Sequence, residues 1–202
     1  DNGPSDCYKV GIQLLSGVRN VHVRDTRIYN NIGSCGDEYQ QGDGIEADHK
    51  AGTPTDIFLE NLQVGNSGDA ELDLKANHVR LHNVRTLGGD KVRYAFKVWA
   101  YDDYTCTHCF AYGVNKAYVN LNQANMTFFD STFANAKAVR PCDLRTGDTV
   151  ELQSKIEFVR SRMYVDNETL VPECGANVLD NVERLPAGNV PAPRPSSGIQ
   201  VR

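Results

Sequence analysis

Hydrophobic and polar residues alternate with a period of two in many short segments of this chain. That period is typical of a β-strand with one buried face. The segments recur in pairs: a short strand is followed by a longer V-x-V-type segment, which passes through a polar residue into another alternating strand. We expect the short strands at 11–15, 44–48, 71–75, 95–99, 118–121 and 149–153, and the longer segments at 21–29, 57–65, 79–87, 104–112, 126–134 and 156–164.

One apolar position can be followed through all six short strands at steps of 23 to 33 residues. It is occupied by Ile12, Ile45, Leu72, Phe96, Val119 and Val150. Irregular steps of this size, with the differences confined to turns, predict the coils of a parallel β-solenoid. Helical repeats are disfavoured because the i, i+3, i+4 pattern is absent, and a β-sandwich would not keep this register through six units.

A second column lies within the longer segments, where the alternation is interrupted by a mostly polar residue. Its members are Asp25, Asn61, Asn83, His108, Asp130 and Arg160. Asn and Asp tolerate a left-handed backbone conformation and bond nearby backbone groups, so we expect a tight turn at this column. We therefore interpret His108 as a turn residue rather than a catalytic base.

These features resemble the right-handed parallel β-helix of the pectate lyase superfamily, in which polar ladders occupy a tight turn between two strands. The resemblance covers roughly residues 10 to 165. It implies an all-β, right-handed parallel β-helix of about six coils over residues 1–173. Residues 174–202, rich in Pro, Gly and Ser, are expected to form an irregular C-terminal extension.

Composition restricts the classes of partner. The chain has 202 residues, 40% hydrophobic and 23% charged, which is typical of a globular protein. Its net charge of -5 gives no reason to expect nucleic acid or an anionic membrane as partner. The first residues do not form a secretory signal, which predicts a processed chain or part of a longer one.

Cysteines and glycosylation motifs favour a secreted protein. Asn125 and Asn167 begin N-x-S/T motifs and are candidate glycosylation sites. The cysteines form an even set, which sequence alone cannot pair: Cys7, Cys35, Cys106, Cys109, Cys142 and Cys174. For the Cys106-x-x-Cys109 pair we favour core thiols or a structural disulfide over zinc or redox chemistry, because no second such pair accompanies it.

The outward position of each short strand forms a column of polar residues, namely Gln13, Glu46, Asp73, Lys97, Asn120 and Glu151. Neighbouring strands lie about 4.8 Å apart, so Glu46, Asp73 and Lys97 are expected side by side on the surface. An exposed pair of opposite charges on adjacent strands stabilises by only about 0.2–1 kcal/mol.

Carboxylates are concentrated around this column. Asp43, Glu46, Asp69, Glu71 and Asp73 fall within two successive coils, and such a set suits a hard cation with oxygen ligands, above all Ca²⁺. A solvated acidic edge is the alternative. A metal that neutralises the carboxylate of a uronate sugar favours removal of its C5 proton by a nearby base, followed by β-elimination.

Three short motifs resemble a specific group, the family 9 pectate lyases. Those enzymes carry D-G-F, then N-x-D-D-G-W-D-L, then G-F-K-L, and this chain has DGI at 43–45, NSGDAELDL at 66–74 and AFKV at 95–98. The resemblance implies that Asp43, Asp69 and Asp73 bind calcium and that Lys97 is the base. Ala70 and Glu71 depart from the pattern, so Glu71 or Glu46 is a candidate for the missing ligand.

The sequence therefore predicts a secreted, Ca²⁺-dependent lyase of an acidic polysaccharide, with Arg93, Lys75 and Trp99 as candidate substrate-binding residues. Two alternatives stay open. One is a non-catalytic β-helix for structure, adhesion or carbohydrate binding, which assembles end to end or is capped by a missing N-terminal segment. The other is a β-helical glycoside hydrolase that uses paired carboxylates.

Overall fold

The computed structural model describes residues 8–33, 41–99, 103–134, 140–144, 154–164, 178–181 and 183–185. Within these ranges the chain is all-β, its strands pair in parallel, and no helix is present. The expected all-β class with parallel strands is confirmed. The described residues contain no helical segment that could cross a membrane.

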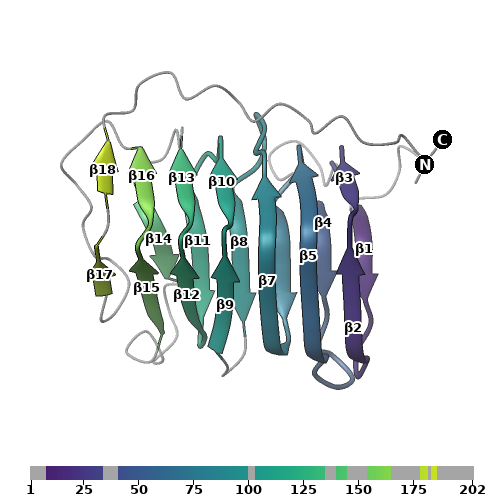
Figure 1. Ribbon diagram of the computed structural model, residues 1–202. Helices are drawn as coiled ribbons and strands as arrows, with labels where there is room; N and C mark the ends of the chain where they lie inside the picture. The colour runs from purple at the N-terminus through teal and green to yellow at the C-terminus, as the bar shows by residue number, and fades with distance from the viewer. Residues whose placement is uncertain are drawn as a thin grey trace.

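The first strand of each repeat unit belongs to one sheet, which we call wall 1 and which lies behind the other strands in Figure 1. Its described strands are, in order, β1 (Val10–Leu14), β4 (Asp43–Ala47), β6 (Ala70–Lys75), β8 (Tyr94–Trp99), β11 (Ala117–Asn122) and β14 (Arg140–Leu144). The pairing aligns Ile12, Ile45, Leu72, Phe96 and Val119, as predicted.

The longer segments form the second sheet, which is bent along its length into wall 2 and wall 3. Wall 2 contains β2 (Arg19–Arg24), β9 (Asp103–Thr107), β12 (Asn125–Phe129), β15 (Lys155–Val159) and β17 (Val178–Asp180). Wall 3 contains β3 (Arg27–Tyr29), β10 (Phe110–Tyr112), β13 (Thr132–Ala134), β16 (Arg162–Tyr164) and β18 (Glu183–Leu185). The long strands β5 (Thr55–Gly65) and β7 (Asn77–Thr86) run through both walls.

The bend between walls 2 and 3 follows the predicted polar column. All six of its residues, His108 included, have left-handed backbone conformations with φ between 48° and 55°. Asn83 donates its side-chain amide to Asn61 at 2.9 Å, and Asn61 donates to Asp25 at 3.1 Å. These bonds between coils offset the cost of placing non-glycine residues in this conformation, which is about 1–2 kcal/mol per residue. The interpretation of His108 as a turn residue is confirmed.

Two expectations near the C-terminus need correction. The strand that pairs with β11 is β14, in which Cys142 is aligned with Val119, so it is not the expected strand at 149–153. Pro141 made β14 hard to predict from the sequence, because proline cannot donate a hydrogen bond to a strand ladder and is found mainly in edge strands. β14 is the last described strand of its sheet. Val150 and Glu151 lie outside the described residues. The parallel pairing also continues past residue 173, since β17 pairs with β15 and β18 with β16.

Apolar side chains from all three walls meet in one continuous core. Aromatic rings fill its later coils: Phe128 stacks on Phe158 at 5.4 Å and meets Phe96 at the same centroid distance. Phe133 contacts both Phe128 and Phe158 edge-on, at 4.8 and 5.1 Å. Each coil therefore buries its apolar residues against the coils before and after it.

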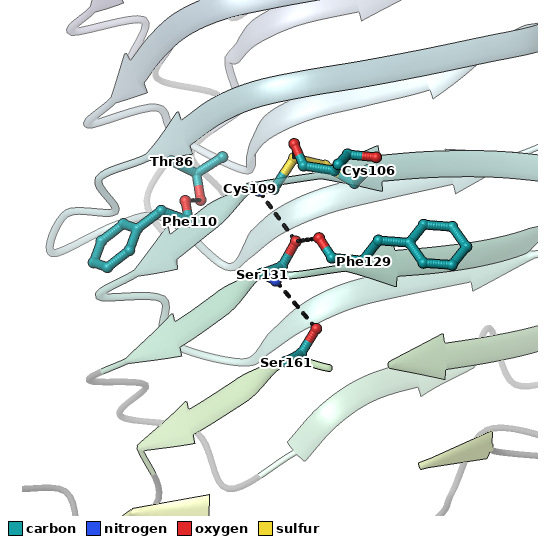
Figure 2. Close-up of a disulfide and its surroundings, with 8 residues drawn as sticks. Thr86, Cys106, Cys109, Phe110, Phe129, Ser131 and Ser161 are labelled. Atoms are coloured by element: carbon teal, nitrogen blue, oxygen red, sulfur yellow. Dashed lines mark hydrogen bonds between the residues drawn. A yellow bond between two sulfur atoms is a disulfide. The ribbon is translucent and has the colours of Figure 1, made fainter. Parts of the chain in front are cut away.

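A disulfide and a serine ladder reinforce the inner side of the bend (Figure 2). Cys106 and Cys109 are joined across the His108 turn, both buried, so this pair is a structural disulfide. Below it, the backbone N–H of Cys109 donates to Ser131 Oγ at 3.1 Å, and that of Ser131 donates to Ser161 Oγ at 3.2 Å. Cys7, Cys35, Cys174 and the side chain of Cys142 lie outside the described part of the chain.

Replacing both cysteines of this bridge, as Cys106→Ala/Cys109→Ala, should lower the free energy of unfolding by about 2 kcal/mol, the loop-closure value for so short a ring. Urea denaturation of the variant and the wild type would measure it. Thr107→Ala, in the same turn but outside the bridge, is the control and should change stability much less. Equal effects of the two variants would contradict a stabilising role for the disulfide.

Candidate functional site

The predicted outward column of wall 1 is present in the structure. Strand pairing aligns Gln13, Glu46, Asp73, Lys97 and Asn120 on consecutive strands. Lys97 Nζ lies 3.0 Å from Asp73 Oδ2 and 2.8 Å from Asp69 Oδ2, so one ammonium group joins two carboxylates. Asp73 and Lys97 are therefore direct neighbours, as the repeat register predicts.

Asp73 and Lys97 are not on the open surface, however, although Gln13 in the first coil is exposed, and this corrects the expectation of an exposed ion pair. The side chain of Asp73 is 3% exposed and that of Lys97 is 15% exposed. Other side chains pack against them: the Tyr8 hydroxyl donates to Glu46 Oε1 at 2.6 Å, and the Lys97 ammonium lies 5.8 Å from the centre of the Trp99 ring. Breaking a buried pair of this kind by removing one partner costs about 3–5 kcal/mol, far more than an exposed pair.

A second lysine joins the same network. Lys75 Nζ lies 3.1 Å from Asp73 Oδ2 and 3.4 Å from Glu46 Oε1, and it is 5.6 Å from the Trp99 ring centre. Lys75 and Trp99 are aligned on neighbouring strands, so the register places the ring over both ammonium groups. The expected neighbourhood of Lys75, Trp99 and Lys97 is thus present.

Arg93 is the more exposed cation of the network. Its guanidinium lies 3.3 Å from Asp69 Oδ1, and its side chain is 36% exposed, against 5% for Asp69. Arg93 therefore connects the buried carboxylates to solvent.

Asp43 is a buried carboxyl group with a raised pKa. Its Oδ1 accepts a hydrogen bond from the backbone N–H of Ala70 at 3.0 Å, and the residue is 2% exposed. Burial, together with the negative charge of Asp73, raises the pKa of Asp43 to about 8. A carboxyl group with this pKa is largely protonated near neutral pH, so Asp43 adds little negative charge to the network.

Glu71 does not belong to this set, which corrects its assignment as a metal ligand. The pairing of β6 with β8 is interrupted at this residue, and Ala70 and Leu72 lie in different hydrophobic clusters. The strict alternation that would point Glu71 outward is therefore broken. Glu71 instead accepts a hydrogen bond from Ser67 Oγ at 2.6 Å and is completely buried.

The neighbouring strand indicates which side Glu71 faces. A Cβ placed on Gly44 would come within 2.1 Å of the core residue Val64 and 3.4 Å of Ser67 Oγ. Glycine at position 44 thus leaves room at the corner where walls 3 and 1 meet. Glu71 occupies the same corner, on the core side of the sheet, and burial raises its pKa to about 8.

The surroundings of Lys97 raise its pKa. Burial alone would lower that pKa, but the carboxylates of Asp73, Asp69 and Asp43 outweigh burial and raise it well above the ordinary lysine value. Arg93 is paired with Asp69 and does not reverse the effect. Lys97 is a protonated, hydrogen-bonded ammonium in this arrangement.

The carboxylates suit calcium by chemistry but do not form a ready-made cage. Across the described residues, no three or more His, Cys, Asp or Glu side chains are grouped so as to hold a metal ion. Asp73 Oδ1 is nevertheless buried and has no hydrogen-bond partner in this part of the chain. An orphaned carboxylate oxygen beside Asp43, Asp69 and Glu46 fits a hard cation that prefers oxygen ligands.

Some contributors were outside the reach of pattern reasoning. Tyr8 precedes the repeats and contacts Glu46 across 38 residues of sequence, so the periodic pattern does not predict this contact.

Asn125, a predicted glycosylation site, begins β12 and donates its amide to Asp103 at 2.8 Å. Asn167, the other predicted glycosylation site, lies outside the described residues.

A scan of the chain against protein-family models gave no match, and neither did a search of curated proteins.

The raised pKa of Glu71 predicts a pH-dependent stability. The folded state binds this proton more tightly than the unfolded state, in which the pKa is near 4.5, so stability is full below pH 4.5 and falls as the pH rises toward 8. Glu71→Gln removes that loss. We expect its stability relative to wild type to increase by on the order of 3 kcal/mol from pH 5 to pH 8.

Urea denaturation at both pH values would check this. Glu60→Gln is the matched control, because Glu60 lies on the outer face of β5, where it bonds His22 at 3.1 Å. Asp43 is present in the wild type and in both variants, so the effect of its raised pKa is the same in all three and drops out of the stability differences. A stability difference between Glu71→Gln and wild type that does not change with pH would contradict the buried, protonated Glu71.

Proposed function

We propose that this protein is a secreted right-handed β-helix that cleaves an acidic, uronate-containing polysaccharide by calcium-dependent β-elimination. The direction of the coils supports the handedness: in Figure 1 the front strands run upward, those of wall 1 run downward behind them, and successive coils advance from right to left. The six-position register of wall 1 and the polar column at the bend support the β-helix itself.

The observation that carries the activity is a partly buried lysine held between carboxylates, one oxygen of which has no hydrogen-bond partner among the described residues. Lys97 contacts Asp69 and Asp73, and Asp73 Oδ1 is the unpaired atom. Asp43, Asp69 and Asp73, with Glu46, would hold the calcium ion. Bound there, calcium would neutralise the substrate carboxylate and compensate the carboxylates that now keep Lys97 protonated.

In this proposal each side chain of the chain has a defined task. With the site's carboxylates compensated, Lys97 would lose its proton to solvent, and the neutral Nζ would take the C5 proton of the uronate unit. The electron pair of the former C–H bond would form the C4–C5 double bond as the C4–O bond breaks, and the leaving sugar oxygen would take a proton from water. Arg93, at the solvent end of the network, pairs with a second substrate carboxylate. The Trp99 ring, beside Lys75 and Lys97, borders the sugar site and restricts water.

A non-catalytic scaffold is the second candidate, and one observation favours it. The apolar residues Ile12, Val21 and Val23 of the first coil are only partly buried, unlike their equivalents in later coils. Partly exposed apolar residues in the first described coil would favour end-to-end assembly. The full ion pairing of Lys75 and Lys97 is then a structural feature of wall 1.

Incubation with polygalacturonate and with alginate, with calcium or with chelator, tests the proposal through the ultraviolet absorbance of unsaturated sugar ends. A calcium-dependent rise supports the lyase. New reducing ends without unsaturated ones would instead indicate a hydrolase. No cleavage, combined with concentration-dependent assembly in light scattering, would favour the scaffold.

Lys97→Arg is the sharpest variant for the proposed base. Arginine keeps a cation between Asp69 and Asp73 but does not release its proton in proteins, so we expect a folded protein whose activity falls at least about a thousandfold. Thermal unfolding would verify the fold, and the absorbance assay would measure the activity. Lys97→Ala is less informative, because it leaves two buried carboxylates uncompensated. Retention of activity by Lys97→Arg would exclude Lys97 as the base.

The calcium requirement separates the proposed ligands from Glu71. Asp73→Asn removes a charged ligand and should raise the calcium concentration for half-maximal activity by at least about tenfold. Glu71→Gln should leave that concentration unchanged, since Glu71 faces the core side of the sheet. Calcium titrations in the absorbance assay would compare the two variants. A similar shift in both would contradict the separation.

A further inference from the structure

Wall 3 presents an outer face that the proposed reaction does not use. Its inward residues are buried, so the alternate residues of the same strands point outward in two rows. One row contains Arg27, Gln63, Arg85, Phe110, Thr132, Arg162 and Glu183, and the other contains Tyr29, Gly65, Tyr112, Ala134, Tyr164 and Leu185. Gln63, Gly65 and Ala134 are buried, so the other members of the two rows form the solvent-facing surface. We call these two rows the wall 3 face.

The charge of the wall 3 face is opposite to that of the whole chain. Its described side chains include Arg27, Arg85 and Arg162, and the one acid among them, Glu183, accepts a hydrogen bond from Arg162 at 3.0 Å. The chain as a whole has a net charge of -5. A local excess of arginine on an acidic protein favours a partner with carboxylate, sulfate or phosphate groups.

Aromatic rings lie between and beside the arginines. Tyr29 is 39% exposed and lies against Gly65, where an added Cβ would stand 3.1 Å from its ring. Phe110 and Tyr112 are stacked with their centroids 6.2 Å apart, and Tyr164 is two coils beyond Tyr112. Rings and guanidinium groups recur at whole multiples of the coil spacing, with about 10 Å between Tyr112 and Tyr164.

We propose that the wall 3 face binds an extended acidic polysaccharide laid along the solenoid axis. Ring faces of Tyr29, Tyr112 and Tyr164 pack against the apolar faces of sugar rings, while Arg85 and its neighbours pair with the carboxylates. A pyranose unit in an extended chain has a length similar to the rise of one coil, so successive units meet successive strands. The identity of the polymer as a uronate rests on the proposed function, but the binding itself does not.

Affinity electrophoresis of the intact protein in gels containing polygalacturonate tests this, with chelator present so that calcium-bridged binding at wall 1 does not contribute. Arg85→Gln and Tyr164→Ala should each raise the apparent dissociation constant, by roughly tenfold for the arginine and several-fold for the ring. Arg85→Lys should restore part of the affinity, and added salt should weaken retention of the wild type. Urea denaturation would verify that each variant is folded.

Matched controls lie on wall 2. Arg80→Gln changes an exposed arginine of the same strand β7, and Phe58→Ala changes a partly buried ring on β5; neither should alter retention. Equal effects of Arg80→Gln and Arg85→Gln, or no effect of either wall 3 variant, would overturn the proposal. A change of sedimentation coefficient in Tyr164→Ala without a change in retention would also overturn it, because the face would then join two copies of the chain. Absence of lyase activity would leave the retention result intact.

Discussion

Parallel pairing between successive coils is the constraint on which the rest of this structure depends. Because neighbouring strands lie about 4.8 Å apart in register, every side chain stacks on its equivalent in the next coil. Apolar columns then form a continuous core, and amide columns bond from coil to coil, as Asn83, Asn61 and Asp25 do. In a charged column, carboxylates of successive coils lie close together and need nearby positive charges. Lys97 and Lys75 supply these charges among the carboxylates of wall 1.

The same constraint explains what the sequence predicts well. A residue type that recurs at one phase of every repeat must occupy one column, so the alignment of Ile12 with Ile45 and of Asp73 with Lys97 follows from counting. The left-handed turn is also readable, because Asn and Asp are the residues that tolerate it. His108 was recognisable as a turn residue only because the column fixed its position.

Burial and facing are less predictable, because they depend on single residues and distant contacts. The pairing is interrupted at Glu71 and at the equivalent position of other wall 1 strands. At Glu71 this places a carboxylate on the core side, which the three-dimensional fit of Gly44, Val64 and Ser67 shows. The neighbouring Glu46 accepts a hydrogen bond from Tyr8, which precedes the repeats. The position of β14 was missed because Pro141 reads as a strand breaker, although an edge strand tolerates it.

The buried carboxyl groups and the interrupted alternation that the sequence did not predict lie in the neighbouring strands β4 and β6. Two carboxyl groups with pKa values raised to about 8, Asp43 and Glu71, lie on opposite sides of wall 1 in β4 and β6. Later coils around Phe128 and Phe158 are ordinary aromatic core. Buried charge lowers stability unless it is compensated. A purely structural solenoid gains no stability from buried ionisable groups in a few neighbouring coils, whereas groups with perturbed pKa values often occur at functional sites. A localised set of groups with perturbed pKa values, next to a partly exposed arginine and a tryptophan ring, therefore argues for a chemical site on β4, β6 and β8 rather than for uniform wall structure.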